Sequence, residues 1–232
     1  MSDRLTTAIA RAEADSSDNI ALTGEERAYV DIAILTAVRA SADDMAQAAR
    51  NALAAGCTPR GIEDVVVQMA AYVGFASSKS AMSHIKSALK ESVPDSVAAL
   101  PGPEARYQLG SADYGRLDPD ALDNIRLAFD EMAHGLINNT FTMFGDLFAS
   151  SSLDLVVRQL ATVGALAALG SAPVQLTFHL GVTRKLEISA ETIVAIFERV
   201  QVHAGIPAAY NALVALKTVL QSSAADAQPA YR

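Results

Sequence analysis

Apolar residues recur every three or four positions along most of this chain, the spacing of amphipathic helices. Short clusters of Gly, Pro, Ser and Thr separate these stretches and supply helix starts and ends. No stretch shows the strict alternation of a half-buried strand, so the chain is predicted to be all-α. The predicted helices cover about residues 24–37, 43–55, 59–73, 77–91, 119–144, 153–169, 172–186, 190–203 and 208–221.

The pattern occurs twice, at a constant spacing of 131 residues, which is the spacing between Ile62 and Ile193. The residues from Ile62 to Ala81 align without a gap on those from Ile193 to Ala212. The same spacing sets Gly74 on Gly205, Lys86 on Lys217, Leu22 on Leu153, Arg27 on Arg158 and Leu35 on Leu166. We interpret the two stretches as tandem helical repeats that pack as one pseudo-symmetric unit.

The repeats divide the chain into three parts. Residues 1–91 form a degenerate N-terminal repeat, and residues 121–232 form a C-terminal repeat that carries the expected site. Between them, residues 92–120 are rich in Pro and Gly and are predicted to be a linker. Leu100, Tyr107, Leu109 and Tyr114 give this segment apolar surface to bury, so we expect a surface arm rather than disorder.

The composition of the chain limits which functions are expected. Half of the residues are apolar, and the formal net charge of −8 comes without a long basic run. Nucleic acid is therefore not an expected partner, because no cationic surface is available for phosphates. The sequence has neither an apolar run of bilayer length nor the apolar core of a signal peptide, which predicts a soluble cytoplasmic protein without a membrane partner.

A single cysteine, Cys57, excludes a disulfide or a CxxC pair within one chain. Metal binding would need an HxxxH pair, or a carboxylate and a histidine at helical spacing; His179 and His203 lie on different predicted helices and have few Asp or Glu neighbours. We therefore predict no metal site and no cofactor.

Several segments of the second repeat resemble the carboxymuconolactone decarboxylase family. They are Phe144-Gly145-Asp146-Leu147-Phe148, the run LDLVVRQLAT from Leu153 to Thr162, His179, and the run from Ile193 through His203-Ala204-Gly205-Ile206-Pro207. The resemblance covers residues 120–221 well and residues 22–90 more weakly. It implies an all-helical, alkylhydroperoxidase-like fold. Because family members usually form rings of six repeats, it also implies a homotrimer of this double-repeat chain.

The chain departs from the family pattern at two places. Peroxidase members have CxxC before the site histidine, whereas residues 170–175 (GSAPVQ) contain no cysteine, so peroxidase activity is not expected. Decarboxylase members resemble Arg-Glu-Leu where this chain has Arg158-Gln159-Leu160. A glutamine forms hydrogen bonds but cannot carry a proton. A further family histidine would lie near Arg199.

The candidate site centres on His179, which matches the site histidine of the family. A well-placed histidine in proton transfer contributes about 10²–10⁴-fold to a rate. Gln159 would orient a substrate oxygen, with Thr162 three residues on and so on the same helix face. Arg158, Arg199 and His203 are further candidates for substrate binding. In the first repeat Ala48 stands where His179 stands in the second, so one working site is predicted.

Two functions are compatible with these residues. The first is a cofactor-free decarboxylase, isomerase or cyclase that acts on a small carbonyl- or lactone-containing metabolite, for example in a secondary-metabolite pathway, by histidine-assisted proton transfer. The alternative is a non-catalytic helical oligomer that binds a small ligand or a partner, in which His179 is a packed core histidine. The sequence names no substrate for either.

Overall fold

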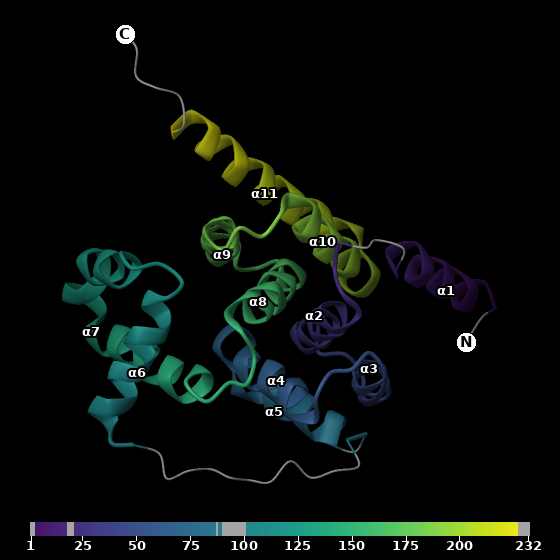
Figure 1. Cartoon of the computed structure of the whole chain (residues 1–232), viewed down its shortest axis with the longest axis horizontal. Helices are drawn as coiled ribbons and strands as arrows, with labels where there is room; N and C mark the ends of the chain where they lie inside the picture. The colour runs from purple at the N-terminus through teal and green to yellow at the C-terminus, as the bar shows by residue number, and fades with distance from the viewer. Residues whose placement is uncertain (1–2, 18–20, 87, 90–100, 227–232) are drawn as a thin grey trace.

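The computed structural model describes residues 3–17, 21–86, 88–89 and 101–226 (Figure 1). Within these residues it has eleven helices and no strand, which confirms the predicted all-α class. The helices before residue 90 are α1 (Asp3–Ser17), α2 (Gly24–Ala37), α3 (Ala42–Ala54), α4 (Pro59–Val73) and α5 (Phe75–Lys86). Those after it are α6 (Pro103–Gly115), α7 (Ala121–Phe148), α8 (Leu155–Leu169), α9 (Pro173–Lys185), α10 (Ala190–Ala204) and α11 (Ile206–Asp226).

Side-chain caps fix the starts of the central helices. Thr23 and Glu26 form a capping box at the start of α2, in which each side chain accepts a hydrogen bond from the other residue's backbone N–H. Ser41, Thr58, Asp154 and Ser189 accept the equivalent bond at α3, α4, α8 and α10. The helix starts predicted at Thr23, Thr58 and Ser189 are confirmed.

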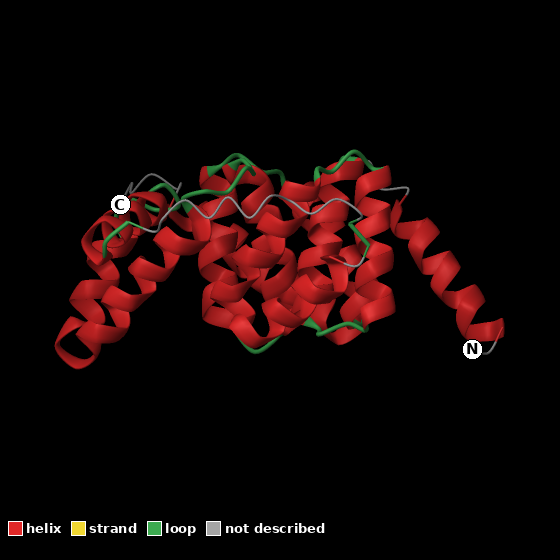
Figure 2. Cartoon of the chain, turned by 90° about the horizontal axis from the view of Figure 1, so that it is seen from below, coloured by secondary structure: helices red, strands yellow, loops and turns green. Residues whose placement is uncertain are grey.

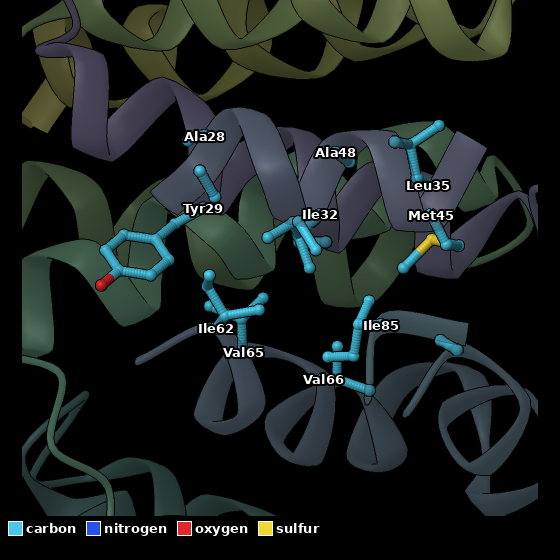
Figure 3. Close-up of a cluster of buried hydrophobic side chains, with 14 of the residues drawn as sticks. Ala28, Tyr29, Ile32, Leu35, Met45, Ala48, Ile62, Val65, Val66 and Ile85 are labelled. Carbon is cyan, nitrogen blue, oxygen red and sulfur yellow. The ribbon is translucent and has the colours of Figure 1, made fainter. Parts of the chain in front are cut away.

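Helices α2 and α8 form the centre of the molecule. They pack closely because Gly164 has no side chain: a Cβ there would lie 3.1 Å from Val30 and 3.3 Å from Ile34. Both helices contribute to two separate hydrophobic clusters, one with α3, α4 and α5 and the other with α9, α10 and α11. Figure 3 shows the first cluster, in which Ile32 of α2 faces Ile62, Val65 and Val66 of α4.

Each half has the same set of helix pairs. In the first half α2 packs on α3 and α4, and α5 packs on α3 and α4. In the second half α8 packs on α9 and α10, and α11 packs on α9 and α10. The halves also exchange contacts reciprocally, α2 with α10 and α4 with α8. Their origin by duplication stays a prediction, as does the division of the chain into three parts.

Two helical arms leave this centre on opposite sides (Figure 2). One is α1, which packs on α10 and lies in a stretch for which the sequence predicts no helix. The other is the hairpin of α6 and α7. Helix α6 lies inside the segment predicted to be a linker, of which residues 92–100 lie outside the described residues. Helix α7 has a kink at Ala133, where φ is −143°.

Candidate functional site

His179 on α9 and Gln159 on α8 are in direct contact. The amide nitrogen Nε2 of Gln159 donates a hydrogen bond of 2.8 Å to the backbone oxygen of His179. Its oxygen Oε1 lies 3.1 Å from His179 Nδ1 and accepts the proton that Nδ1 carries. Gln159 Nε2 also lies 3.1 Å from Nδ1. In the tautomer that is protonated at Nδ1, the imidazole Nε2 keeps a lone pair. The two residues that the sequence analysis names as the centre of the site thus lie side by side.

The imidazole of His179 is neutral at pH 7. The residue is only 4% exposed, and its burial lowers its pKa from 6.5 to about 3, because the charged form would lose its hydration. Aromatic rings surround it: Tyr72 lies edge-on at 5.5 Å and Phe178 at 5.1 Å between ring centroids. His179 can therefore accept a proton or a hydrogen bond at neutral pH, but it does not store a proton there.

Helix α4 supplies further polar groups to this site. Nε2 of Gln68 donates hydrogen bonds of 2.8 Å to Thr162 Oγ1 and of 2.8 Å to the backbone oxygen of Arg158. Gln68 is 1% exposed, and its oxygen Oε1 has no hydrogen-bond partner among the described residues. We call Gln68, Tyr72, Gln159, Thr162 and His179 the His179 cluster.

Arg158 borders the His179 cluster and is held by the α6–α7 arm. Its two terminal nitrogens donate to both carboxylate oxygens of Asp113, one at 3.1 Å, and the guanidinium stacks on Phe148 at 4.7 Å. The neighbouring Tyr114 stacks on Phe178, with 6.1 Å between the ring centroids. Of the three guanidinium nitrogens of Arg158, only Nε is buried without a hydrogen-bond partner among the described residues. A predicted substrate-binding arginine is thus largely engaged by its own chain.

Arg199 and His203 belong to a different cluster. On α10 they stand one helical turn apart and face α1 and α2. Arg199 donates to both carboxylate oxygens of Asp31, at 2.7 and 2.9 Å, and to Glu13 at 2.9 Å, and it also bonds Ser16. His203 Nε2 lies 3.2 Å from Asp31 Oδ1. We call Glu13, Ser16, Asp31, Arg199 and His203 the Asp31 cluster.

The carboxylate of Asp31 is ionised. Burial by itself would raise its pKa, but hydrogen bonds from His203 and Arg199 and the charge of Arg199 outweigh burial and lower the pKa below its usual value. Asp31 is therefore a permanent negative charge at neutral pH, held between the two residues of α10.

Arg199 and His203, predicted to bind substrate together with His179, contact Asp31 and Glu13 instead. The residues that meet Thr162 and His179 from the neighbouring helix are Gln68 and Tyr72 of α4, which the sequence analysis does not name as site residues. The 131-residue spacing is the signal that identifies them, because it sets Gln68 on Arg199 and Tyr72 on His203.

The fold and the buried His179–Gln159 pair define an all-helical protein with a polar site between helices. Residues 137–218 match the model of the carboxymuconolactone decarboxylase family. The match includes Gln159, Thr162 and His179. No curated relative matches the chain.

None of the helices in the described ranges has the length and apolar character needed to cross a membrane. Within the same residues, no three His, Cys, Asp or Glu side chains are grouped as ligands of a metal ion.

Proposed function

We propose that this chain is a cofactor-independent, carboxymuconolactone decarboxylase-like enzyme that acts on a small carbonyl- or lactone-containing metabolite, with His179 as the proton-transfer residue. The observation that carries the proposal is the buried His179–Gln159 pair inside the family segment. Buried polar atoms without partners are rare in folded proteins. Gln68 Oε1 and Arg158 Nε, an acceptor and a donor, are two such atoms on helices α4 and α8, which meet at the His179 cluster.

The protonation state of His179 supports isomerisation among the possible reactions. A neutral imidazole can take a proton from a carbon next to the substrate carbonyl, which leaves an enolate and an imidazolium. The imidazolium can then return that proton to a second carbon, so the reaction needs no proton from solvent. Decarboxylation, in contrast, requires a proton donor for the carbanion that remains. Gln159 keeps Nδ1 protonated and so directs Nε2 to the substrate.

Thiol chemistry is not part of the proposal. Residues 170–175 contain no cysteine, and burial raises the pKa of Cys57 to about 11, so this thiol stays protonated at neutral pH. The thiol of Cys57 also donates to the backbone oxygen of Glu25, at 3.6 Å. Both observations support a function other than peroxide reduction.

The proposal includes a homotrimer in the cytoplasm. Apolar side chains on α7 remain exposed in the single chain, with Leu127 at 90% and Met132 at 80% exposure. Helix α11 exposes a second apolar row that includes Tyr210 and Val214. Exposed patches of this kind are typical of protein–protein contacts. Light scattering on the purified chain tests the trimer, and a monomer at micromolar concentration would contradict it.

The test of the enzyme uses His179→Gln, which keeps a hydrogen-bonding side chain of similar size. The native chain is incubated in D₂O with a panel of lactones and keto acids, and NMR follows deuterium uptake next to the carbonyl as well as product formation. We expect His179→Gln to lower the rate by about 10²-fold or more. His203→Ala is the matched control and should keep the native rate. Equal rates for the native chain and His179→Gln would remove His179 from the mechanism.

One observation favours the alternative, a non-catalytic helical oligomer that binds a small ligand or a partner. A histidine with a pKa of about 3 is a weak base. In addition, two hollows of about 330 and 1210 Å³ in the surface are lined by neither His179 nor Gln159. Absence of both turnover and deuterium exchange with the whole panel, in a chain that is folded by circular dichroism, would decide for this alternative.

A further inference from the structure

A groove of about 1210 Å³ lies on the side of the molecule away from the α6–α7 arm. Residues of α1, α2, α3 and α10 line it, and Figure 1 shows these helices together around the N-terminal arm. The Asp31 cluster lies in its wall, since Glu13, Ser16, Asp31, Arg199 and His203 are all lining residues. The groove is thus separate from the His179 cluster.

Two alanines explain why this place is hollow. Ala28 and Ala48 line the groove, and the 131-residue spacing sets them on Gln159 and His179. Where the second half fills the space with an amide and an imidazole, the first half has two methyl groups. The polar residues on the other side of this space are present in both clusters. Arg199 donates a hydrogen bond to Asp31 in the groove, as Gln68 donates to Thr162 at the corresponding positions of the His179 cluster. The groove therefore combines free space with a fixed polar wall.

The charge of the residues that line the groove favours one class of ligand. Five acidic side chains (Glu13, Asp15, Asp31, Asp44 and Glu198) line the groove against two arginines, Arg27 and Arg199, so these charges sum to −3 (2 − 5). Arg199 is only 3% exposed and is paired with Asp31 and Glu13, and these three side chains together keep one net negative charge. A cleft lined by one sign of charge concentrates ligands of the opposite sign.

Apolar side chains line the rest of the groove. Ala8, Ile9 and Ala12 of α1 face it from one side, and Leu35 and Val38 of α2 from another. Such walls suit the flat or aliphatic body of a small molecule, while the few polar groups at one end fix its orientation.

We propose that this groove is a second ligand site, specific for a small organic cation with an apolar body, such as an amidinium or a protonated amine. The cation lies against Asp31 and Glu13, and the apolar body takes the space beside Ala28 and Ala48. The site is independent of the proposed activity at His179, and it uses residues of both halves of the chain.

Three probes of one shape and different charge test the site: benzamidine (+1), benzamide (0) and benzoate (−1). Titration calorimetry and ligand-observed NMR on the full chain measure their binding. We expect benzamidine to bind about tenfold or more tightly than benzamide, benzoate to bind most weakly, and added salt to weaken benzamidine alone. Equal binding of the three probes, or no binding of benzamidine at millimolar concentration, would overturn the proposal.

Two variants locate the bound probe. Ala48→His fills the groove with the side chain that the second half has, and it should abolish benzamidine binding. Glu13→Gln removes one charge from a side chain that is 40% exposed, so the fold is kept, and it should weaken benzamidine several-fold without affecting benzamide. His179→Gln should leave benzamidine binding unchanged. Loss of binding in His179→Gln, with native affinity in both groove variants, would place the probe at the other cluster and refute this site.

Discussion

Two polar clusters lie where the halves of the chain meet, and each takes side chains from both halves. In the His179 cluster, Gln68 donates to Thr162; in the Asp31 cluster, Arg199 donates to Asp31. Gln68 and Thr162 correspond to Arg199 and Asp31 at the 131-residue spacing, but the first cluster consists of neutral groups, whereas the second contains the ions Glu13, Asp31 and Arg199. The same arrangement of helices therefore supports two kinds of chemistry.

The two clusters also differ in how far their side chains are exposed to solvent. Gln159, Thr162 and His179 are 2–4% exposed, whereas the side chains of Asp31 and His203 keep 19% and 14% of their exposure. Neutral groups that satisfy each other's hydrogen bonds can be buried at modest cost, but ions lose far more hydration energy. A cluster of ions is stable beside an open groove, and a cluster of neutral groups can be closed over by an arm such as α6.

The largest expected effect separates the two buried arginines. Asp113→Ala leaves the guanidinium of Arg158 buried without its carboxylate, and we expect a loss of about 3–5 kcal/mol in the free energy of unfolding. Glu13→Ala removes a 40% exposed partner of Arg199, which keeps Asp31, so the loss should be about 0–1 kcal/mol. Urea unfolding measures both. Equal losses would show that the two ion pairs are equally exposed to solvent.

The second effect concerns the histidines. His179→Ala opens a cavity and leaves Gln159 Oε1 without its donor, which we expect to cost about 2–4 kcal/mol. His203→Ala removes a ring at the edge of a groove, and its cost should be about 1 kcal/mol or less. The same unfolding experiment compares them. A cheaper His179→Ala would mean that the His179 cluster is loosely packed.

The third effect is the dependence of stability on pH. The unfolded chain protonates His179 below its ordinary pKa of 6.5, while the folded chain keeps it neutral down to about pH 3. Between these values the unfolded state binds more protons, so stability falls as the pH is lowered, by about 1.4 kcal/mol per pH unit. Unfolding of the native chain and of His179→Gln, from pH 6.5 to about pH 5, isolates this contribution. Parallel slopes would refute it.

Asp31 also makes the free energy of unfolding fall as the pH is lowered, but in a lower range of pH than His179. Its folded pKa lies below the ordinary value of 3.8, so the stability that it contributes is present above that value and is lost only in stronger acid. The comparison of the native chain with His179→Gln above pH 5 is therefore free of this carboxylate.

The central helices were predictable because their signals are local. Thr23 and Glu26, three residues apart, define the start of α2 without knowledge of the rest of the chain. The choice of His179 and Gln159 as candidate site residues comes from the family resemblance, which gives no contact between them. The partners from α4 depend on how the halves cross, and periodicity along one helix carries no information on that crossing. The 131-residue spacing carries it, but only once the positions of both halves are compared pair by pair.

The two arms were not predictable in the same way. Helix α1 is held through Glu13 and Ser16 by Arg199, which lies more than 180 residues away in the sequence. Helix α6 contains Gly110, which the sequence analysis counts among the glycines of a linker. In the structure Gly110 and Gly145 let the backbones of α6 and α7 approach, since a Cβ at Gly110 would clash with the Phe141 carbonyl oxygen. A glycine that permits close packing has the same sequence signature as one that ends a helix.

The smallest expected effect comes from converting one cluster toward the other. Ala28→Gln with Ala48→His places the amide and the imidazole of the His179 cluster into the groove beside Asp31, where space is available. Because no core packing is lost and the new side chains border solvent, we expect the free energy of unfolding to change by less than about 1 kcal/mol. The reverse double change, Gln159→Ala with His179→Ala, should cost several times more, because it empties a closed space. Urea unfolding of the two double variants gives the ratio. If the groove conversion is the more costly one, Ala28 and Ala48 are required by packing in their own half, and the hollow beside Asp31 is not the space of the missing amide and imidazole.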